Sequence, residues 1–316
     1  MDETMIQDEL IEAPGPSGMP PLAQLLPMLS SMSAQLSPAE TTEGLRQSHP
    51  GLAAVEISEV DIDLNVPARY YSTPNSTGRP LLVWVHGGAF VGGDLDMPEA
   101  NWVGLALAGR GFNVLSIDYR KAVDGIAYPA PLEDVLTGWR WAQANAARLG
   151  VGSVHLGGAS AGASLVASAT LKLRDHGAAT PESVVLAYPT LHRVLPKWNA
   201  NEIEKIRDAA GMAYFSASWL KEMGENYLGD GGGDNGRYAF PAEAQLSELP
   251  PQLILLADLD SLRSSGEDYA RLVTTAGGTA DTWFAENALH GFLSGPLGMG
   301  AEAGIAAIAD WLESHA

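Results

Sequence analysis

The sequence predicts an α/β protein with a mainly parallel sheet, and three observations support that prediction. Short runs of uninterrupted apolar residues recur along the chain, as in strands that are covered on both faces. Helix-like stretches separate most of these runs, which is the pattern of right-handed βαβ units. A hydrophobic fraction of 46% over 316 residues supplies a large core. A charged fraction of 18% excludes a mainly disordered chain.

Composition also excludes several classes of function. The chain has 38 acidic and 18 basic residues and a formal net charge of −20, whereas a nucleic-acid binder needs a basic face. No run approaches the roughly 18 apolar residues of a membrane helix. The absence of cysteine excludes disulfides, thiolate catalysis and cysteine-ligated metals. The first residues are acidic, unlike the basic start of a secretion signal, so we expect a cytoplasmic protein.

Residues 1–50 are predicted to form an acidic tail and short amphipathic helices. The first twelve residues hold five acids and no base, and a linker rich in proline and glycine follows at 14–18. Residues 22–29 are apolar at helical spacing, although Pro27 interrupts them. Ser37-Pro38-Ala39-Glu40 is a capping box that begins a further helix. These helices have too little core to fold alone and must pack on later parts of the chain.

The core of the fold is expected in two stretches, 51–190 and 246–316. Alternating residues predict a half-buried strand at 55–62, and a second strand is expected at 68–71. Buried strands are expected at 81–85, 113–117, 154–156, 184–187 and 253–256, and a further apolar strand is expected at 282–285. Helices are expected at 132–149 and 161–173. This alternation of strand and helix makes the sheet mainly parallel.

Residues 191–245 break this rhythm and are interpreted as an insertion that covers the sheet together with the N-terminal helices. Helices are expected at 203–210 and 216–227, followed by the glycine-rich run 231–236. That run resembles a calcium-binding glycine repeat but occurs only once, so we expect a flexible loop. No nucleotide or zinc motif occurs and the histidines are dispersed, so neither a cofactor nor a metal is expected.

The main chemical signal is Gly158-Ala159-Ser160-Ala161-Gly162, which lies between a predicted strand and a predicted helix. In that context a GxSxG motif places a nucleophilic serine on a sharp, strained turn. Side chains at Gly158 and Gly162 would collide with the neighbouring strand and helix. The alternative is a small-residue crossing that only packs the helix on the strand.

A serine hydroxyl needs a base and an orienting acid, and in this kind of fold both follow the serine in the chain. Only His290 and His315 follow a suitable acid, and His315 is the penultimate residue. His290 is therefore the predicted base. Asp258 and Asp260 both lie just after the strand at 253–256, and spacing alone does not separate them.

His86-Gly87-Gly88-Ala89-Phe90 follows the buried strand at 81–85. Small residues after a strand leave backbone N–H groups open, so Gly87 and Gly88 are expected to stabilise an oxyanion together with the N–H of Ala161. His86 is expected to brace the loop. The alternative is a plain turn at the end of the strand.

Together these motifs resemble the hormone-sensitive-lipase-like group of α/β-hydrolases, bacterial carboxylesterases with an HGGG motif. Matching segments are 86–90, 118–120, 128–134, 158–162, 249–251, 260–266 and 290–292, in the order of the family. The resemblance implies an eight-stranded α/β-hydrolase fold with a helical cap, and it selects Asp260 as the acid. The sequence departs from the family pattern at Ala89, Ala159, Ser261 and the segment 119–124.

The predicted function is hydrolysis of small to medium carboxylic esters through an acyl-enzyme. Amide, lactone or thioester hydrolysis by the same residues is the alternative within enzymes, and a non-catalytic ligand-binding protein is the alternative outside them. Phe90, Trp198, Trp219 and Phe292 are the candidate substrate-pocket residues. An exposed edge strand near Thr282 would allow a homodimer.

Overall fold

A computed structural model describes residues 22, 24, 41–63, 66–197 and 200–316. They form one sheet of eight strands in the order β1-β2-β4-β3-β5-β6-β7-β8. β1 pairs antiparallel with β2, and β2 pairs antiparallel with β4, whereas all other neighbours are parallel. The predicted α/β fold with an eight-stranded, mostly parallel sheet is confirmed.

The predicted strands agree with those of the structure most closely where they are buried. The strands are β1 Glu56–Asp63, β2 Val66–Ser72, β3 Leu81–Val85, β4 Asn113–Ile117, β5 Val154–Ala159, β6 Val184–Ala187, β7 Gln252–Leu259 and β8 Ala280–Leu289. β3, β4 and β6 have the bounds predicted from their apolar runs. β5 extends further at its carboxyl end, and β7 and β8 extend further at both ends, because polar or small residues interrupt their apolar runs.

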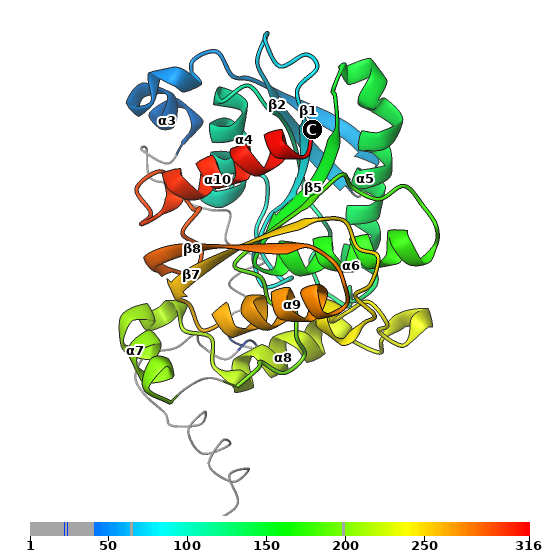
Figure 1. The fold of residues 1–316 in the computed structure, drawn as a ribbon, viewed down its shortest axis with the longest axis vertical. Coiled ribbons are helices and arrows are strands. Elements are labelled where there is room, and N and C mark those ends of the chain that lie inside the picture. Colours follow the sequence, from blue (N-terminus) through cyan, green and yellow to red (C-terminus); the bar gives the residue numbers. More distant parts are fainter. Residues whose placement is uncertain (1–21, 23, 25–40, 64–65, 198–199) are drawn as a thin grey trace, which may run out of the picture.

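Helices cover both faces of the sheet (Figure 1). On one face lie α5 Ala130–Leu149, α6 Ala161–Asp175 and α9 Arg263–Thr275. On the other lie α3 Thr42–Ser48, α4 Pro98–Gly109 and α10 Ala301–Ser314. Side chains of β3 alternate between the two cores: Val83 belongs to the first and Trp84 to the second. This alternation follows from the two-residue period of a strand.

The helix α4 was not predicted from the sequence. Its residues from Glu99 to Ala108 are all buried, so it lacks the polar face from which an amphipathic helix is recognised. Pro98 at its first turn and Glu99 beside it are ordinary residues for a helix start. This buried helix passes close to the candidate site.

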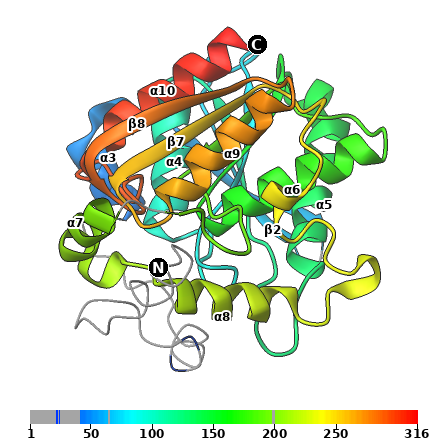
Figure 2. The ribbon, with the colours of Figure 1, turned by 60° about the horizontal axis from the view of Figure 1, so that its bottom comes forward.

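The insertion contains α7 Ala200–Ala210, α8 Ala217–Leu228 and short 3-10 turns at Gly211–Ala213, Gly232–Asp234 and Pro241–Glu243. Figure 2 shows α7 and α8 along one end of the molecule. Arg263 of α9 joins α7 to the core, since it pairs with Glu202 of α7 at 3.0 Å and with Asp258 of β7 at 3.0 Å. The glycine-rich run is held by Asp234, which accepts a hydrogen bond from the Tyr128 hydroxyl at 2.7 Å.

Most of the predicted N-terminal helical segment lies outside the described residues. Two described parts of it contact different regions. The N–H of Leu22 donates to the Glu222 side chain of α8 at 3.3 Å, so this residue contacts the insertion. By contrast, α3 lies beside α4 and α10 (Figure 1), because Leu45 is buried in the second core with Trp102. No described helix is long and apolar enough to cross a membrane.

Candidate active site

Ser160 lies on the sharp turn that joins β5 to α6. Its backbone has φ 52° and ψ −120°, a conformation that L-residues rarely adopt. The flanking glycines allow this turn. A Cβ at Gly162 would lie 2.2 Å from the Val85 carbonyl oxygen, and one at Gly158 would lie 2.7 Å from the same atom. The turn therefore needs glycine at both positions, and it lifts the serine side chain off the end of the strand.

The structure brings Ser160, His290 and Asp260 into one hydrogen-bonded row. Ser160 Oγ lies 3.0 Å from His290 Nε2, and His290 Nδ1 lies 2.8 Å from Asp260 Oδ2. β8 runs to Leu289, so His290 directly follows the strand rather than a longer loop. Asp260 is fully buried, and its other oxygen accepts the N–H of Leu262 at 2.8 Å. The buried carboxylate thus has one oxygen committed to the backbone and the other to the imidazole.

The structure shows which of the two candidate aspartates contacts the imidazole, a choice that their spacing in the sequence did not decide. Asp258 accepts hydrogen bonds from the Arg263 side chain at 3.0 Å and from the N–H of Asn287 at 3.3 Å. These contacts tie the ends of β7 and β8 to α9. Of the two aspartates, only Asp260 is hydrogen-bonded to His290.

The loop after β3 lies against the nucleophile. A Cβ built at Gly87 would lie 3.3 Å from Ser160 Cβ. Within the described part of the chain, the N–H groups of Gly88, Ala89 and Ala161 have no hydrogen-bond acceptor. Ala161 is the first residue of α6, whose N-terminal end favours negative charge. These three N–H groups are the available donors for an oxyanion.

The expectation that Gly87 is one of these donors is wrong. Its N–H donates to Glu99 Oε2 at 3.0 Å and is not available to a substrate. Sequence reasoning missed this because Glu99 lies twelve positions later, in the helix that was not predicted. Its only signal in the sequence is a carboxylate within a strongly apolar segment.

Glu99 is buried, with 2% of its surface exposed. Its second oxygen, Oε1, accepts the indole N–H of Trp84 at 2.5 Å. Burial raises the pKa of Glu99 to about 7, although the hydrogen bonds from Gly87 and Trp84 and the charge of His290 oppose that rise. An acid that titrates near neutral pH thus lies directly behind the loop.

His86 braces the loop, as expected. One ring nitrogen lies 2.9 Å from Asp118 Oδ1 and the other 2.7 Å from the Gly87 carbonyl oxygen. The ring stacks on Tyr119 at a centroid distance of 4.6 Å. His86 is 1% exposed and has no direct contact with the serine hydroxyl in the described structure.

The four residues that the sequence suggested for the substrate pocket differ in their surroundings. Trp198 lies outside the described residues. Phe90 is buried and stacks on Tyr227 of α8 at 4.0 Å, and Phe292 is buried against Tyr188. Trp219 packs on Phe215 at a centroid distance of 5.2 Å. Of the candidate residues, Phe292 also lines a groove beside His290.

Two aromatic residues that sequence reasoning missed contact the imidazole directly. Phe215 and Tyr188 lie edge-on to His290 at centroid distances of 4.8 and 5.0 Å. Phe215 comes from the insertion, and its N–H donates to the Ser261 hydroxyl at 3.0 Å. Ser261 replaces the proline of the family pattern, so the insertion is attached to the residue next to Asp260.

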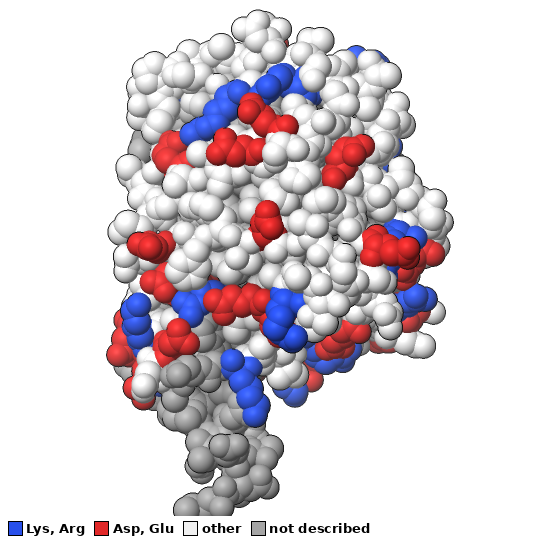
Figure 3. Space-filling view, viewed as in Figure 1, with Lys and Arg blue, Asp and Glu red and all other residues white. Residues whose placement is uncertain are grey.

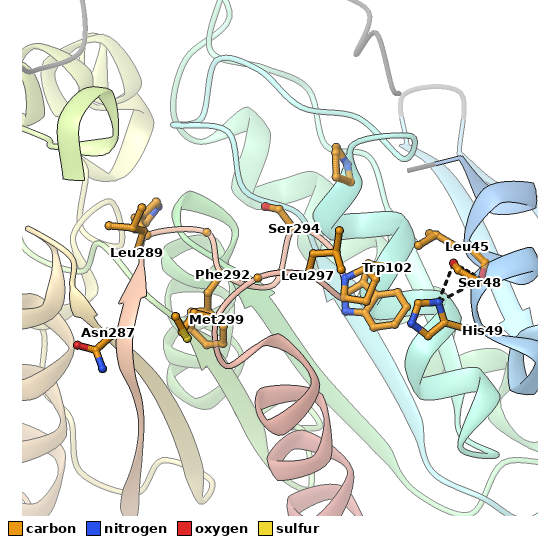
Figure 4. Close-up of a pocket in the computed structure, with 16 residues that line it drawn as sticks. Leu45, Ser48, His49, Trp102, Asn287, Leu289, Phe292, Ser294, Leu297 and Met299 are labelled. Carbon is orange, nitrogen blue, oxygen red and sulfur yellow. Dashed lines mark hydrogen bonds between the residues drawn. The ribbon is translucent and has the colours of Figure 1, made fainter. Parts of the chain in front are cut away.

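A groove of about 570 Å³ opens on another side of His290. Figure 4 shows its lining, which comes from α3, from Trp102 of α4, from the end of β8 and from the segment after that strand. The lining is mainly apolar, and Leu297 and Met299 are 95% and 63% exposed. Among the described residues no group of three or more His, Asp or Glu side chains could hold a metal ion.

A family described by its α/β hydrolase fold matches residues 82–294, a stretch that holds all three residues of the hydrogen-bonded row. The chain belongs to the α/β-hydrolase family. The α/β hydrolase is 29% identical to the esterase LipI of Mycobacterium tuberculosis over 85% of this chain and 87% of that protein. It is 33% identical to the carboxylic ester hydrolase LipN of the same organism, over 79% of this chain and 67% of that one.

Solved structures agree with this assignment. An esterase from Pyrobaculum calidifontis superposes on the α/β hydrolase with a TM-score of 0.72 and 25% identity, covering 99% of this chain and 93% of that one. The predicted resemblance to hormone-sensitive-lipase-like hydrolases is confirmed.

Proposed function

We propose that this α/β hydrolase is a serine carboxylesterase that uses Ser160, His290 and Asp260 as its catalytic triad. The observation that carries the proposal is the row of hydrogen bonds from Ser160 Oγ to Asp260, at 3.0 and 2.8 Å, beside a strained serine turn. Relatives that cover most of the chain are named as an esterase and a carboxylic ester hydrolase, which supports the same reaction.

The geometry assigns a role to each group. Nε2 of His290 takes the proton of Ser160 as Oγ attacks the ester carbonyl, and the buried Asp260 stabilises the resulting imidazolium. The N–H groups of Gly88, Ala89 and Ala161 stabilise the oxyanion, each worth about 3 kcal/mol of barrier. His290 then gives the proton to the leaving alcohol. Water attacks the acyl-enzyme with His290 again as base, and this releases the acid and regenerates Ser160.

The substrates are proposed to be small to medium esters. Phe215 of the insertion lies against His290, so the insertion contacts the base and supports a limit on the size of the acyl group. The apolar groove beside His290 supports esters with an apolar group. The negative net charge of −20 favours neutral substrates over anionic ones.

A panel of p-nitrophenyl esters from acetate to laurate, with matched anilides and lactones, tests this proposal. Hydrolysis of the acetate and butyrate esters should exceed that of the anilides and lactones. Ser160→Ala should lower kcat by about a thousandfold or more while circular dichroism stays unchanged. Preferred turnover of anilides, or undiminished activity in Ser160→Ala, would contradict the assignment.

We also propose a homodimer formed through β8. This strand is at the edge of the sheet, and its Phe284 and Leu289 are 43% and 39% exposed. An unpaired strand edge with apolar side chains favours pairing with a second copy. Sedimentation velocity measures the state directly. The cytoplasmic location stays a prediction from the sequence.

A further inference from the structure

We propose that Glu99 is a positioning residue of the oxyanion site. By holding the N–H of Gly87 away from the substrate, Glu99 directs the next N–H groups of the loop toward the substrate. This inference rests on the proposed esterase function and goes beyond the triad. It depends on three features of the loop and of the helix α4 that carries Glu99.

The first feature is backbone strain in the loop. Gly88, Ala89 and Phe90 have positive φ values of 116°, 54° and 65°. Three such residues in succession are costly, especially the two that carry a Cβ, and they persist only where neighbours determine the backbone. At Gly88 the conformation requires glycine, because a Cβ would lie 2.2 Å from the Gly92 carbonyl oxygen.

The second feature is that the loop is held at both ends. At its far end, Phe90 stacks on Tyr227, and its carbonyl oxygen accepts the N–H of Ala122 at 2.8 Å. At its near end, the N–H of Gly87 is held by Glu99 at 3.0 Å. Removing the near contact leaves the strained residues free to relax and move the donors from their positions beside Ser160.

The third feature is the chemistry of the carboxylate. Each oxygen of Glu99 accepts one N–H, from Trp84 and from Gly87, so the geometry suits the ionised form with no proton on either oxygen. The N-terminal end of α4 also favours negative charge. When Glu99 is protonated, its O–H group faces one of the two N–H donors, Trp84 or Gly87. Because both groups are then donors, one hydrogen bond is lost.

Loop position is therefore linked to pH. Burial raises the pKa of Glu99 to about 7, and the titratable groups that influence or are influenced by its charge are His290, Tyr188 and Tyr119. Burial raises the pKa of both tyrosines well above the usual range of tyrosine, so neither of them titrates near neutral pH with Glu99. As pH falls through about 7, Glu99 takes a proton, and activity should fall more steeply than a single ionisation allows.

The test compares Glu99→Gln with the matched variant Glu302→Gln. Glu302 occupies the first turn of α10 on the same face of the sheet, but pairs with Arg110 away from the site. With p-nitrophenyl butyrate, Glu99→Gln should lower kcat at least tenfold with little change in KM, and its acid limb should fit one ionisation where the wild type shows two. Binding of an alkyl trifluoromethyl ketone, whose adduct carries an oxyanion, should weaken by the same factor as kcat/KM.

Wild-type kcat and two ionisations in folded Glu99→Gln would overturn the proposal, as would a loss confined to KM. Because wild type, Glu302→Gln and Ser160→Ala are assayed together, failure of the esterase proposal is seen separately as inactivity of the wild type. If Glu99→Gln does not fold, Trp84→Phe removes one N–H donor to the carboxylate. That variant should shift the acid limb to higher pH, and an unshifted limb would also overturn the proposal.

Discussion

At the residue scale, the candidate site depends on which aspartate the imidazole reaches. Asp258 lies within β7, whereas Asp260 is the first residue after the strand ends at Leu259. Asp260 faces His290, whereas Asp258 faces Arg263 and the N–H of Asn287. The two carboxylates thus differ in function although they share a strand end.

Asp260→Asn should therefore lower kcat by about a thousandfold to ten-thousandfold, because an amide does not hold the imidazole in the required tautomer. Asp258→Asn should lower kcat by about tenfold or less and should lower the melting temperature instead. Initial rates on p-nitrophenyl butyrate and a thermal melt of both variants measure the difference. The reverse ranking in kcat would assign the acid to Asp258.

The sequence was sufficient to predict Ser160 and His290, because the order of nucleophile, acid and base leaves few histidines to choose from. It could not separate Asp258 from Asp260 without the family resemblance, since spacing does not define side-chain direction. It also could not show that the N–H of Gly87 is occupied. The N–H of Gly87 is occupied because it contacts Glu99 of α4. Since every non-proline residue has a backbone N–H, the sequence does not show which of these groups is already bonded.

At the scale of elements, a buried polar cluster joins β5, the segment before β6, and α10. His155 of β5 lies 2.8 Å from the hydroxyls of both Ser153 and Ser183, and Ser183 accepts the indole N–H of Trp311 of α10 at 2.9 Å. Burial, assisted by the charge of His315, lowers the pKa of His155 to about 4. The fold therefore holds this imidazole neutral.

This cluster predicts acid sensitivity with a defined sign. The folded pKa lies below the unfolded value of about 6.5, so the stability is present above pH 6.5 and is lost as pH falls toward 4. Between pH 7 and 5 the wild type should lose about 2 kcal/mol more of unfolding free energy than His155→Gln. Urea titrations at both pH values measure this, with the exposed His176→Gln as control. Equal losses in wild type and His155→Gln would show that His155 does not bind the proton.

The sequence predicted accurately the bounds of three strands that are buried on both faces. β3, β4 and β6 are buried on both faces, and their apolar runs end where the strands end. α4 was missed because burial on all sides removes its periodicity, and β8 was predicted too short because its last residues alternate irregularly. The insertion was recognised as a break in the pattern, but the contact of Phe215 with His290 depends on tertiary packing.

At the scale of the whole molecule, the acidic surplus is spread unevenly. Residues 1–50 carry seven acidic residues and one basic residue. On the face shown in Figure 3, acidic and basic side chains alternate over α7 and α9, where Arg263, Glu202 and Glu267 pair. Because positive and negative side chains are mixed on this surface, it does not form a patch of one charge. The net charge therefore affects solubility and substrate choice rather than catalysis.

The fold as a whole presents Ser160 as an activated nucleophile. Labelling with a fluorophosphonate, followed by peptide mass spectrometry, tests this most directly, because the reagent phosphonylates a serine that a neighbouring base activates. We expect one adduct per chain on the peptide that contains Ser160, and none in Ser160→Ala. An adduct on a different residue, or no adduct in folded wild-type protein, would contradict the role of Ser160 as the nucleophile.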